Sequence, residues 1–306
     1  NFTVTHNTAL NRTTTYQVQQ TALGDQQRTI TMPNGVQEVL LERQNGSTVQ
    51  TAPDGTITNT QLGGDPRWQM QAPLTISTNV TTPGALHYSS TFGRTVSLAN
   101  PSDPLSLATQ TDTLVVNSRT YTSVFNAATR TFTDATPQGR QTTRVIATQG
   151  RLTSLQVSAL NPLAATYDVR GRLATTVFGT GLTARTSTYA YNAAGFLSSF
   201  TDALARVTGF SYDNAGRVTQ QTLPDARVIG FGYDAAGNLN SLTPPGRPAH
   251  TFTYNAVDLV QSYVAPGNVT TTYSYNLDRD LTNITRPDAL QLNFAYDSAG
   301  RLQTLT

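Results

Sequence analysis

The chain has 306 residues, of which 37% are hydrophobic and only 12% are charged, and its formal net charge is +2 at pH 7. The absence of cysteine excludes a disulfide framework and a thiolate site. No basic run marks a nucleic-acid partner, and no stretch of about 18 apolar residues is present that would span a membrane. Abundant threonine and only two glutamates, Glu38 and Glu42, favour an almost all-β protein, and nothing in the sequence requires a cofactor.

The first part of the chain, residues 1–140, carries turn signals such as Pro33-Asn34-Gly35 and Pro53-Asp54-Gly55. Their spacing of about ten residues predicts short strands joined by tight turns. One short helix is expected near Gln37 to Arg43. Because composition does not change along the chain, we expect residues 1–140 to be a degenerate hairpin region. It should continue into a repeat region over residues 141–306.

The repeat region is built on the phrase Tyr-Asp-x-x-Gly-x-Leu, with Asn or Val as substitutes, and from Tyr191 to Tyr296 its copies start every 21 residues. A fixed period of this size indicates a repeat architecture. An upstream copy starts at Tyr167, 24 residues before the next. The residues expected to define the copies are Tyr167, Asp168, Gly171, Tyr191, Gly195, Tyr212, Asp213, Gly216, Tyr233, Asp234, Gly237, Tyr254, Tyr275, Tyr296, Asp297 and Gly300.

One period is predicted to form one β-hairpin. In the copy that starts at Tyr212, the Asp213 carboxylate can accept backbone hydrogen bonds and Gly216 can adopt a positive φ, so the phrase is a turn. The following residues, 217–223, alternate as a strand does, and Pro224 begins a second turn before the strand of residues 227–233. Two turns and two strands per period are mutually consistent.

Each repeat tyrosine is preceded, two residues earlier, by another aromatic residue. Residues i and i+2 of a strand share a face, so each hairpin should present an aromatic pair on one side. A leucine or valine six residues after each tyrosine is placed to pack between these rings. The pattern predicts one apolar inner face and one polar outer face. The preceding aromatic residues are Tyr189, Phe210, Phe231, Phe252, Tyr273 and Phe294.

The fold expected from these patterns is all-β, with nearly thirty strands. Open twisted sheets rarely exceed about ten strands before they curl or split. We therefore predict an antiparallel ribbon of hairpins that winds into a hollow spiral tube or shell. The alternative is a β-propeller, in which two periods would make one four-stranded blade.

The phrase Tyr-Asp-x-x-Gly-Arg-Leu, followed by a Pro-Asp or Pro-Gly turn and then aromatic-x-Tyr-Asp, resembles the YD repeat of the Rhs proteins, which toxin-complex shell proteins and teneurins share. The resemblance is specific over residues 165–306, although Asp258 and Arg279 stand where the family has glycine. It implies a hollow β-strand shell, often around a C-terminal toxin that is released by self-cleavage. The family's self-cleaving aspartyl motif should follow the repeats, and the partial look-alike at Asp103-Pro104 precedes them, so we interpret that segment as a turn.

Other candidates for chemistry are weak. The three histidines, His6, His87 and His250, lack metal-ligand spacing, and His250 is expected to be a ladder residue. Asp278 and Asp280 form the nearest carboxylate pair, but they lie in a repeat turn. We therefore expect no catalytic residue, no metal and no cofactor, and we expect the chain not to be an enzyme.

Three functions remain open. The first is a structural shell segment of a large secreted or surface-exposed, bacterial protein that encloses or presents another polypeptide, such as a toxin. The second is a self-assembling extracellular fibre or adhesin, which would pair through open strand edges. The third is a carbohydrate-binding module that uses the repeat aromatics, and Asn-x-Ser/Thr sequons such as the one at Asn283 also allow attached glycans. Expected partners are other parts of a longer parent chain, an enclosed cargo polypeptide, copies of the chain and glycans.

Overall fold

The computed structural model describes residues 1–306, which form 27 β-strands and one three-residue 3-10 turn, η1 (Gly181–Thr183). The chain divides into two compact units. The first unit comprises residues 1–7, 13–165 and 178–183, and the second, called here the repeat unit, comprises residues 8–12, 166–177 and 184–306. Because η1 is so short, no helix of the chain could cross a lipid bilayer.

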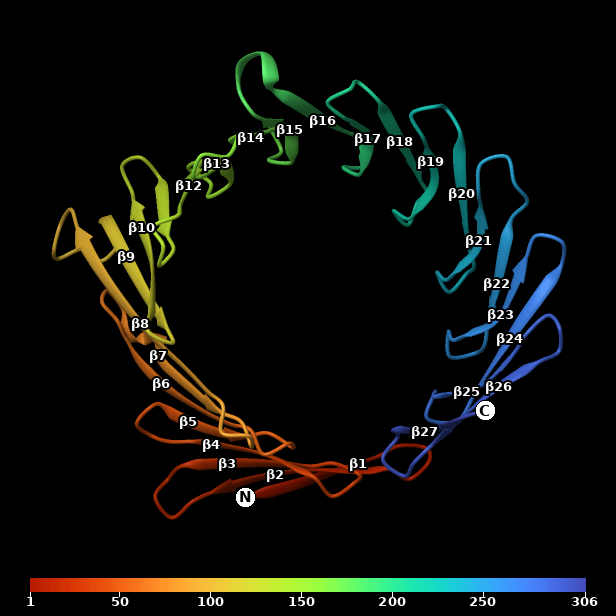
Figure 1. Ribbon diagram of the computed structural model, residues 1–306, viewed down its shortest axis with the longest axis horizontal. Helices are drawn as coiled ribbons and strands as arrows, with labels where there is room; N and C mark the ends of the chain where they lie inside the picture. The colour runs from red at the N-terminus through yellow and green to blue at the C-terminus, as the bar shows by residue number, and fades with distance from the viewer. The chain divides into compact units, whose positions relative to one another are not determined.

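The first unit is a continuous antiparallel meander in which each strand pairs with the next from β1 to β14 (Figure 1). Its longest strands are β7 and β8, with 13 and 12 residues. Its strands are β1 (Phe2–Asn7), β2 (Thr13–Gln20), β3 (Gln26–Thr31), β4 (Gln37–Glu42), β5 (Ser47–Thr51), β6 (Ile57–Asp65), β7 (Gln69–Thr81), β8 (His87–Leu98), β9 (Leu107–Val116), β10 (Arg119–Asn126), β11 (Thr131–Ala135), β12 (Gln141–Ile146), β13 (Leu152–Val157) and β14 (Leu163–Tyr167).

The repeat unit contains strands of four to seven residues, and each of β16 to β26 pairs antiparallel with the strand that follows it. Twelve strands paired without a break exclude the four-stranded blades of a propeller. The strands are β15 (Leu173–Phe178), β16 (Arg185–Tyr191), β17 (Leu197–Thr201), β18 (Val207–Tyr212), β19 (Val218–Thr222), β20 (Val228–Tyr233), β21 (Leu239–Thr243), β22 (His250–Tyr254), β23 (Val260–Ala265), β24 (Val269–Tyr275), β25 (Leu281–Thr285), β26 (Gln291–Tyr296) and β27 (Leu302–Leu305).

One expectation for the first unit was wrong. The segment predicted as a short helix, Gln37 to Arg43, is strand β4. Val39 in this strand pairs with Thr29 of β3 on one side and with Thr51 of β5 on the other. Glutamate and leucine favour helices locally, but pairing on both edges outweighs that weak preference.

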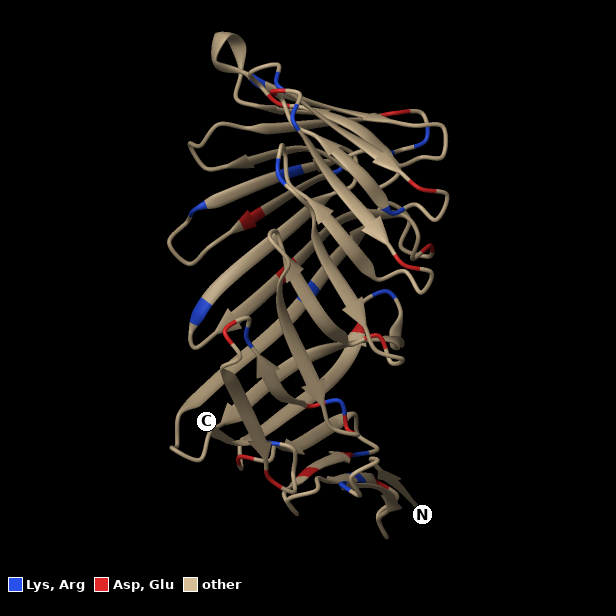
Figure 2. Cartoon of the chain, turned by 90° about the vertical axis from the view of Figure 1, so that its right-hand side faces the viewer, with Lys and Arg blue, Asp and Glu red and all other residues tan.

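The turns of the first unit repeat one hydrogen-bond pattern that the repeat turns also use. In the turn at Met32, its N–H donates to Val36 O at 2.9 Å and the Gly35 N–H donates to Met32 O at 2.8 Å. The turn at Asp213 does the same, with Arg217 O at 3.0 Å and Gly216 N–H to Asp213 O at 3.0 Å. Charged residues lie mostly in such turns (Figure 2). That residues 1–140 are a degenerate stretch of the repeat ribbon stays a prediction.

The chain lacks an ordinary hydrophobic core. No hydrophobic side chain is fully buried, and the accessible surface is 18933 Å². A compact monomer of this mass would expose about 12,500 Å². Strand residues are mostly half-buried, as a sheet covered on neither face by a second layer would require.

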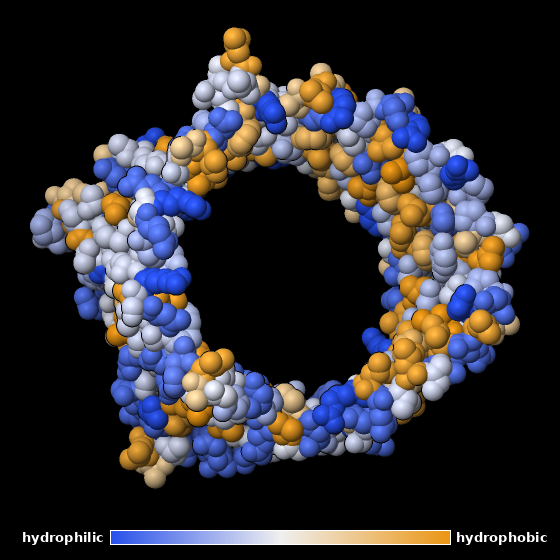
Figure 3. Space-filling view, viewed as in Figure 1, coloured by the Kyte–Doolittle hydropathy of each residue, from blue (hydrophilic) through white to orange (hydrophobic).

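The hydrophobic side chains of the repeat unit collect on one face of its sheet. On β22, Phe252 and Tyr254 are half-buried while Thr251 and Thr253 are exposed. Figure 3 shows hydrophobic residues along the side toward which the sheet of the repeat unit curves. The predicted apolar face and polar face are thus both present, and the apolar face has no covering layer.

Candidate functional surface

The turn that opens each copy is held by its own acidic residue. In the Tyr212 copy, Asp213 Oδ1 accepts hydrogen bonds from Ala215 N and Arg217 N, both at 2.9 Å, and Oδ2 accepts one from Arg217 Nε at 2.8 Å. The Arg217 N–H, and next its guanidinium, hold the pKa of the Asp213 carboxyl below its ordinary value. Gly216 has a φ of 80°. Asp168 and Asp297 make the same bonds in their copies.

The two copies that lack the glycine keep the same backbone turn. Asp258 and Arg279 adopt φ values of 61° and 69° at the glycine position. Asn255 and Asn276 replace the aspartate, and their Oδ1 atoms accept from the backbone two and four residues on. The turn therefore depends on an acceptor at this position and on a positive φ, and less on the identity of the residue that adopts it.

The repeat tyrosines join consecutive hairpins through their hydroxyl groups. The Tyr212 hydroxyl donates to Leu197 O at 2.7 Å, and the Tyr233 hydroxyl donates to Val218 O at 2.9 Å. Four more tyrosines bond the equivalent carbonyl of the preceding copy: Tyr191, Tyr254, Tyr275 and Tyr296. Each accepting residue is the leucine or valine that the sequence places six residues after a tyrosine. The sequence alone indicated packing here but not this hydrogen bond.

The residue five positions after each tyrosine also reaches the next copy. Arg217 lies over the Tyr233 ring, with its Cζ 4.6 Å from the ring centroid, and a Cβ on Gly237 would lie 3.4 Å from its Nη1. Phe196 takes this place in its copy, because it stacks on Tyr212 at 5.0 Å and lies against Gly216. This position, called here the bridge position, is occupied along the chain by Arg172, Phe196, Arg217, Asn238, Leu259, Asp280 and Arg301.

The aromatic residue two before each tyrosine contacts the neighbouring strand of its own hairpin. The Tyr189 ring lies 5.3 Å from Phe200, its partner in the ladder, and Phe252 lies 5.3 Å from its partner Tyr263. His250 pairs with Leu242 in the ladder, and its Nδ1 lies 2.7 Å from the Tyr263 hydroxyl.

The apolar face of the repeat unit opens into a groove of about 500 Å³. Aromatic rings and aliphatic side chains line this groove, and none of the lining residues is charged: Phe252, Val260, Tyr263, Tyr273, Tyr275 and Leu281. A concave apolar lining with tyrosine hydroxyl groups suits contact with another chain or with a flat apolar ligand.

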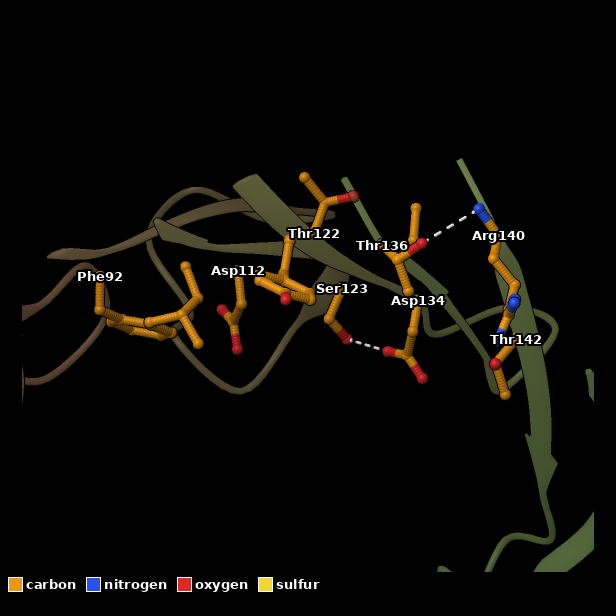
Figure 4. A pocket seen from close by; sticks show the side chains of 11 residues that line it. Phe92, Asp112, Thr122, Ser123, Asp134, Thr136, Arg140 and Thr142 are labelled. Carbon is orange, nitrogen blue, oxygen red and sulfur yellow. Dashed lines mark hydrogen bonds between the residues drawn. The ribbon is translucent and has the colours of Figure 1, made fainter. Parts of the chain in front are cut away.

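The first unit instead carries a row of polar side chains across five neighbouring strands. Asp112 faces Arg94 on one side and Ser123 on the other, and Ser123 in turn faces Asp134. Arg94 donates to both Asp112 oxygens at 2.7 and 2.8 Å, and the Ser123 hydroxyl donates to Asp134 at 2.6 Å. Three residues of the row, Asp112, Ser123 and Asp134, line a cavity of about 350 Å³ together with Phe92 and other residues (Figure 4).

The aspartates of this row are engaged with cations. Arg144 donates to both oxygens of Asp134, at 2.9 and 3.2 Å. Arg94 reaches a second carboxylate, Asp65, at 3.0 Å, and the Asp65 side chain is only 3% exposed. Burial by itself raises the pKa of Asp65, but hydrogen bonds from Arg67 N and Arg94 outweigh it and lower the pKa.

The remaining sequence candidates lie on three different elements. Asp103 is in an exposed turn, where its Oδ1 accepts from Leu105 N at 2.9 Å. His6 and His87 lie on β1 and β8. No group of three or more histidine, aspartate or glutamate side chains is arranged to hold a metal ion.

Comparison with protein families gives one decisive match. The family model described as the teneurin YD-shell matches residues 2–306. The chain belongs to the teneurin YD-shell family. No curated protein sequence matches this YD-shell chain significantly.

Solved structures have the same fold as this YD-shell chain. The crystal structure of TcdB2-TccC3 aligns with a TM-score of 0.56 at 15% identity, over 95% of this chain and 20% of that one. The crystal structure of TcdB2-TccC3-Cdc42 aligns with a TM-score of 0.55 at 15% identity, over 95% of this chain and 19% of that one. The structure of the Photorhabdus luminescens Tc holotoxin pore aligns with a TM-score of 0.55 at 14% identity, over 96% of this chain and 19% of that one. The predicted all-β shell fold is confirmed, and the chain spans about a fifth of the length of these matched chains.

Proposed function

We propose that the chain is a non-enzymatic wall segment of a larger YD-shell protein, and that its uncovered apolar face lies against an enclosed or presented polypeptide. The observation that carries this is the single-layered sheet: no hydrophobic side chain is fully buried, although the repeat unit aligns its rings and aliphatic side chains on one face. Such a face exposes apolar surface to water, which is unfavourable. A second polypeptide packed on the face would cover that surface.

Family membership and fold support the same proposal. The matched structures are parts of Tc toxin complexes, and this chain corresponds to a fifth of their length. A toxin-type cargo and a secreted or cell-surface, bacterial setting belong to this proposal. The repeat residues act in it as structural elements, since their side chains bond within and between hairpins.

The test is photo-crosslinking in the protein as its source produces it. A photoreactive phenylalanine analogue replaces Tyr273, which lines the apolar groove, and in a second variant it replaces the exposed Thr253 on the polar face. We expect crosslinks from position 273 to a polypeptide segment outside residues 1–306, and few from position 253. Equal crosslinking from both positions, or none from position 273, would contradict the proposal.

Electron microscopy of the purified chain distinguishes the fibre alternative. Shell-like particles of fixed size support a wall segment, whereas long uniform filaments would assign the function to a fibre that grows through its strand edges. The carbohydrate alternative is favoured by one observation, the ring-lined groove of about 500 Å³. It predicts that glycans quench tyrosine fluorescence, and that Tyr263→Ala removes the quenching.

A further inference from the structure

The Tyr275 copy departs from the other copies in a way that reverses its charges. In the Tyr212 copy an aspartate follows the tyrosine and an arginine holds the bridge position, and the two side chains pair at 2.7 Å. In the Tyr275 copy the corresponding residues are Asn276 and Asp280, and Asp278 lies between them. This turn therefore contains two carboxylates and has lost its own bridging cation.

A cation reaches these carboxylates from the other end of the chain. The turn at residues 8–12, which connects β1 to β2, belongs to the repeat unit. Arg12 Nη1 lies 2.7 Å from Asp280 Oδ2 and 3.0 Å from Asp278 Oδ2. The Thr8 hydroxyl donates to Asp278 Oδ2 at 2.7 Å, and Leu10 N donates to Asp278 Oδ1 at 3.0 Å.

Arg12 occupies the place that a bridging arginine has in other copies. Such an arginine pairs with the acidic residue of its own copy and lies against the glycine of the next, as Arg217 does with Asp213 and Gly237. Arg12 pairs with Asp280, and a Cβ on Gly300 of the following copy would lie 3.0 Å from its Nη1.

We propose that the Tyr275 copy is a docking site for the turn at residues 8–12, and that Arg12 replaces the bridging arginine that this copy lacks. The charge reversal is then a specificity device. In a copy with its own aspartate and arginine, the two side chains pair with each other and need no partner. In a copy with two carboxylates, the charges favour a cationic partner.

Burial makes this contact more demanding than an ordinary surface ion pair. The side chain of Asp278 is 4% exposed and that of Arg12 is 12% exposed. Without Arg12, the neighbouring carboxylates Asp278 and Asp280 would repel each other with no cation between them. The turn at residues 8–12 would then separate from the Tyr275 copy, instead of losing only one bond. The hydrogen bond from Asn276, and after it the hydrogen bond and charge of Arg12, outweigh burial and lower the pKa of Asp280.

The experiment follows hydrogen exchange of the Leu10 amide, because its acceptor, Asp278 Oδ1, lies 268 residues away in the sequence. Two variants release the turn by different routes. Arg12→Ala removes the cation, and the double variant Asn276→Asp, Asp280→Arg gives the Tyr275 copy its own pair. The control, Arg217→Ala, removes a bridging arginine in a copy that does not contact residues 8–12.

We expect the Leu10 amide to exchange about tenfold faster or more in both releasing variants, and at the wild-type rate in the control. The double variant keeps the Tyr275 turn itself protected, which separates release of the docked turn from unfolding of the hairpin. Unchanged Leu10 exchange in both releasing variants would overturn the proposal. Protection that rises with protein concentration would overturn it too, because the turn would then be docked on a second copy of the chain.

Discussion

The two units stabilise sheets of the same type by different means. The repeat unit uses strands of four to seven residues and repeats a small set of bonds in each period: an acidic side chain in the turn, a tyrosine hydroxyl on the preceding copy and a bridge residue on the next. The first unit uses strands of five to 13 residues and one ionic network that joins Asp65, Arg94 and Asp112. Stability is therefore distributed over many equivalent contacts in one unit and concentrated in a few distinct contacts in the other.

This difference predicts the largest single effect in the first unit. Arg94→Ala removes the close cation from Asp112 and from Asp65, whose side chain is 3% exposed, and leaves Asp65 with only the Arg67 guanidinium, whose Nε lies 4.0 Å away. We expect a loss of about 4 kcal/mol in the free energy of unfolding. Denaturant titration of the purified chain measures it.

The matched control is Arg144→Ala. Its ion pair with Asp134 is much more open, with side chains 41% and 32% exposed, so the loss should be about 1 kcal/mol. Equal losses in the two variants would mean that the ionic network of Asp65, Arg94 and Asp112 stabilises the first unit no more than a surface ion pair does. The proposed difference between the two units would then be wrong.

The next largest effect concerns the repeat turns. Gly216→Val places a β-branched residue at a φ of 80° and its Cβ 2.6 Å from Phe196 Cζ, so strain and a steric clash combine. We expect a loss of about 3 kcal/mol. Gly139→Val, at a φ of 74° with no atom within 4 Å of the added Cβ, should lose about 1.5 kcal/mol from strain alone. An unchanged melting temperature in Gly216→Val would contradict the turn assignment.

A smaller effect tests whether the tyrosine bonds are equivalent. Tyr233→Phe removes the hydroxyl that donates to Val218 O at 2.9 Å, and should cost about 1 kcal/mol. Tyr254→Phe should cost the same, and the double variant should be additive if each bond acts locally. Tyr88→Phe, at an exposed tyrosine of the first unit, should be neutral. Strongly unequal losses in the two repeat variants would show that the tyrosine hydroxyl bonds do not contribute equally to the free energy of unfolding.

The sequence predicted these two units unequally well. In the repeat unit, the 21-residue period, the turn glycines and the aromatic pairs follow from spacing alone, because each copy satisfies most of its bonds locally. The tyrosine hydroxyl bond was missed, since its acceptor is a backbone carbonyl that no sequence pattern identifies. The bridge position was not predicted, because only three of its seven residues, Arg172, Arg217 and Arg301, are arginines and the other four share no chemistry. In the first unit, the partners Asp65 and Arg94 lie 29 residues apart with no periodic signal.

The smallest expected effect is the pH dependence of the repeat turns. Hydrogen bonds, chiefly from the backbone of residues four positions on, hold the pKa of Asp168, Asp213 and Asp297 below the ordinary value. A folded-state pKa below the unfolded one, about 3.9, means that this contribution is present above that pH. It is lost as the pH falls through the folded-state pKa.

Because these carboxylates are close to solvent, each contributes little, and only the three together should be measurable. Replacing all three by asparagine keeps the acceptor oxygen, as Asn192 does in its own copy, but removes the ion pair. We expect the melting temperature of the triple variant to fall less than that of the wild type when the pH is lowered from about 6 to about 3. Asp288→Asn is the control, since its pair with Arg286 is about half exposed on both sides. An identical fall in the triple variant would place the acid sensitivity in the concentrated network of the first unit instead.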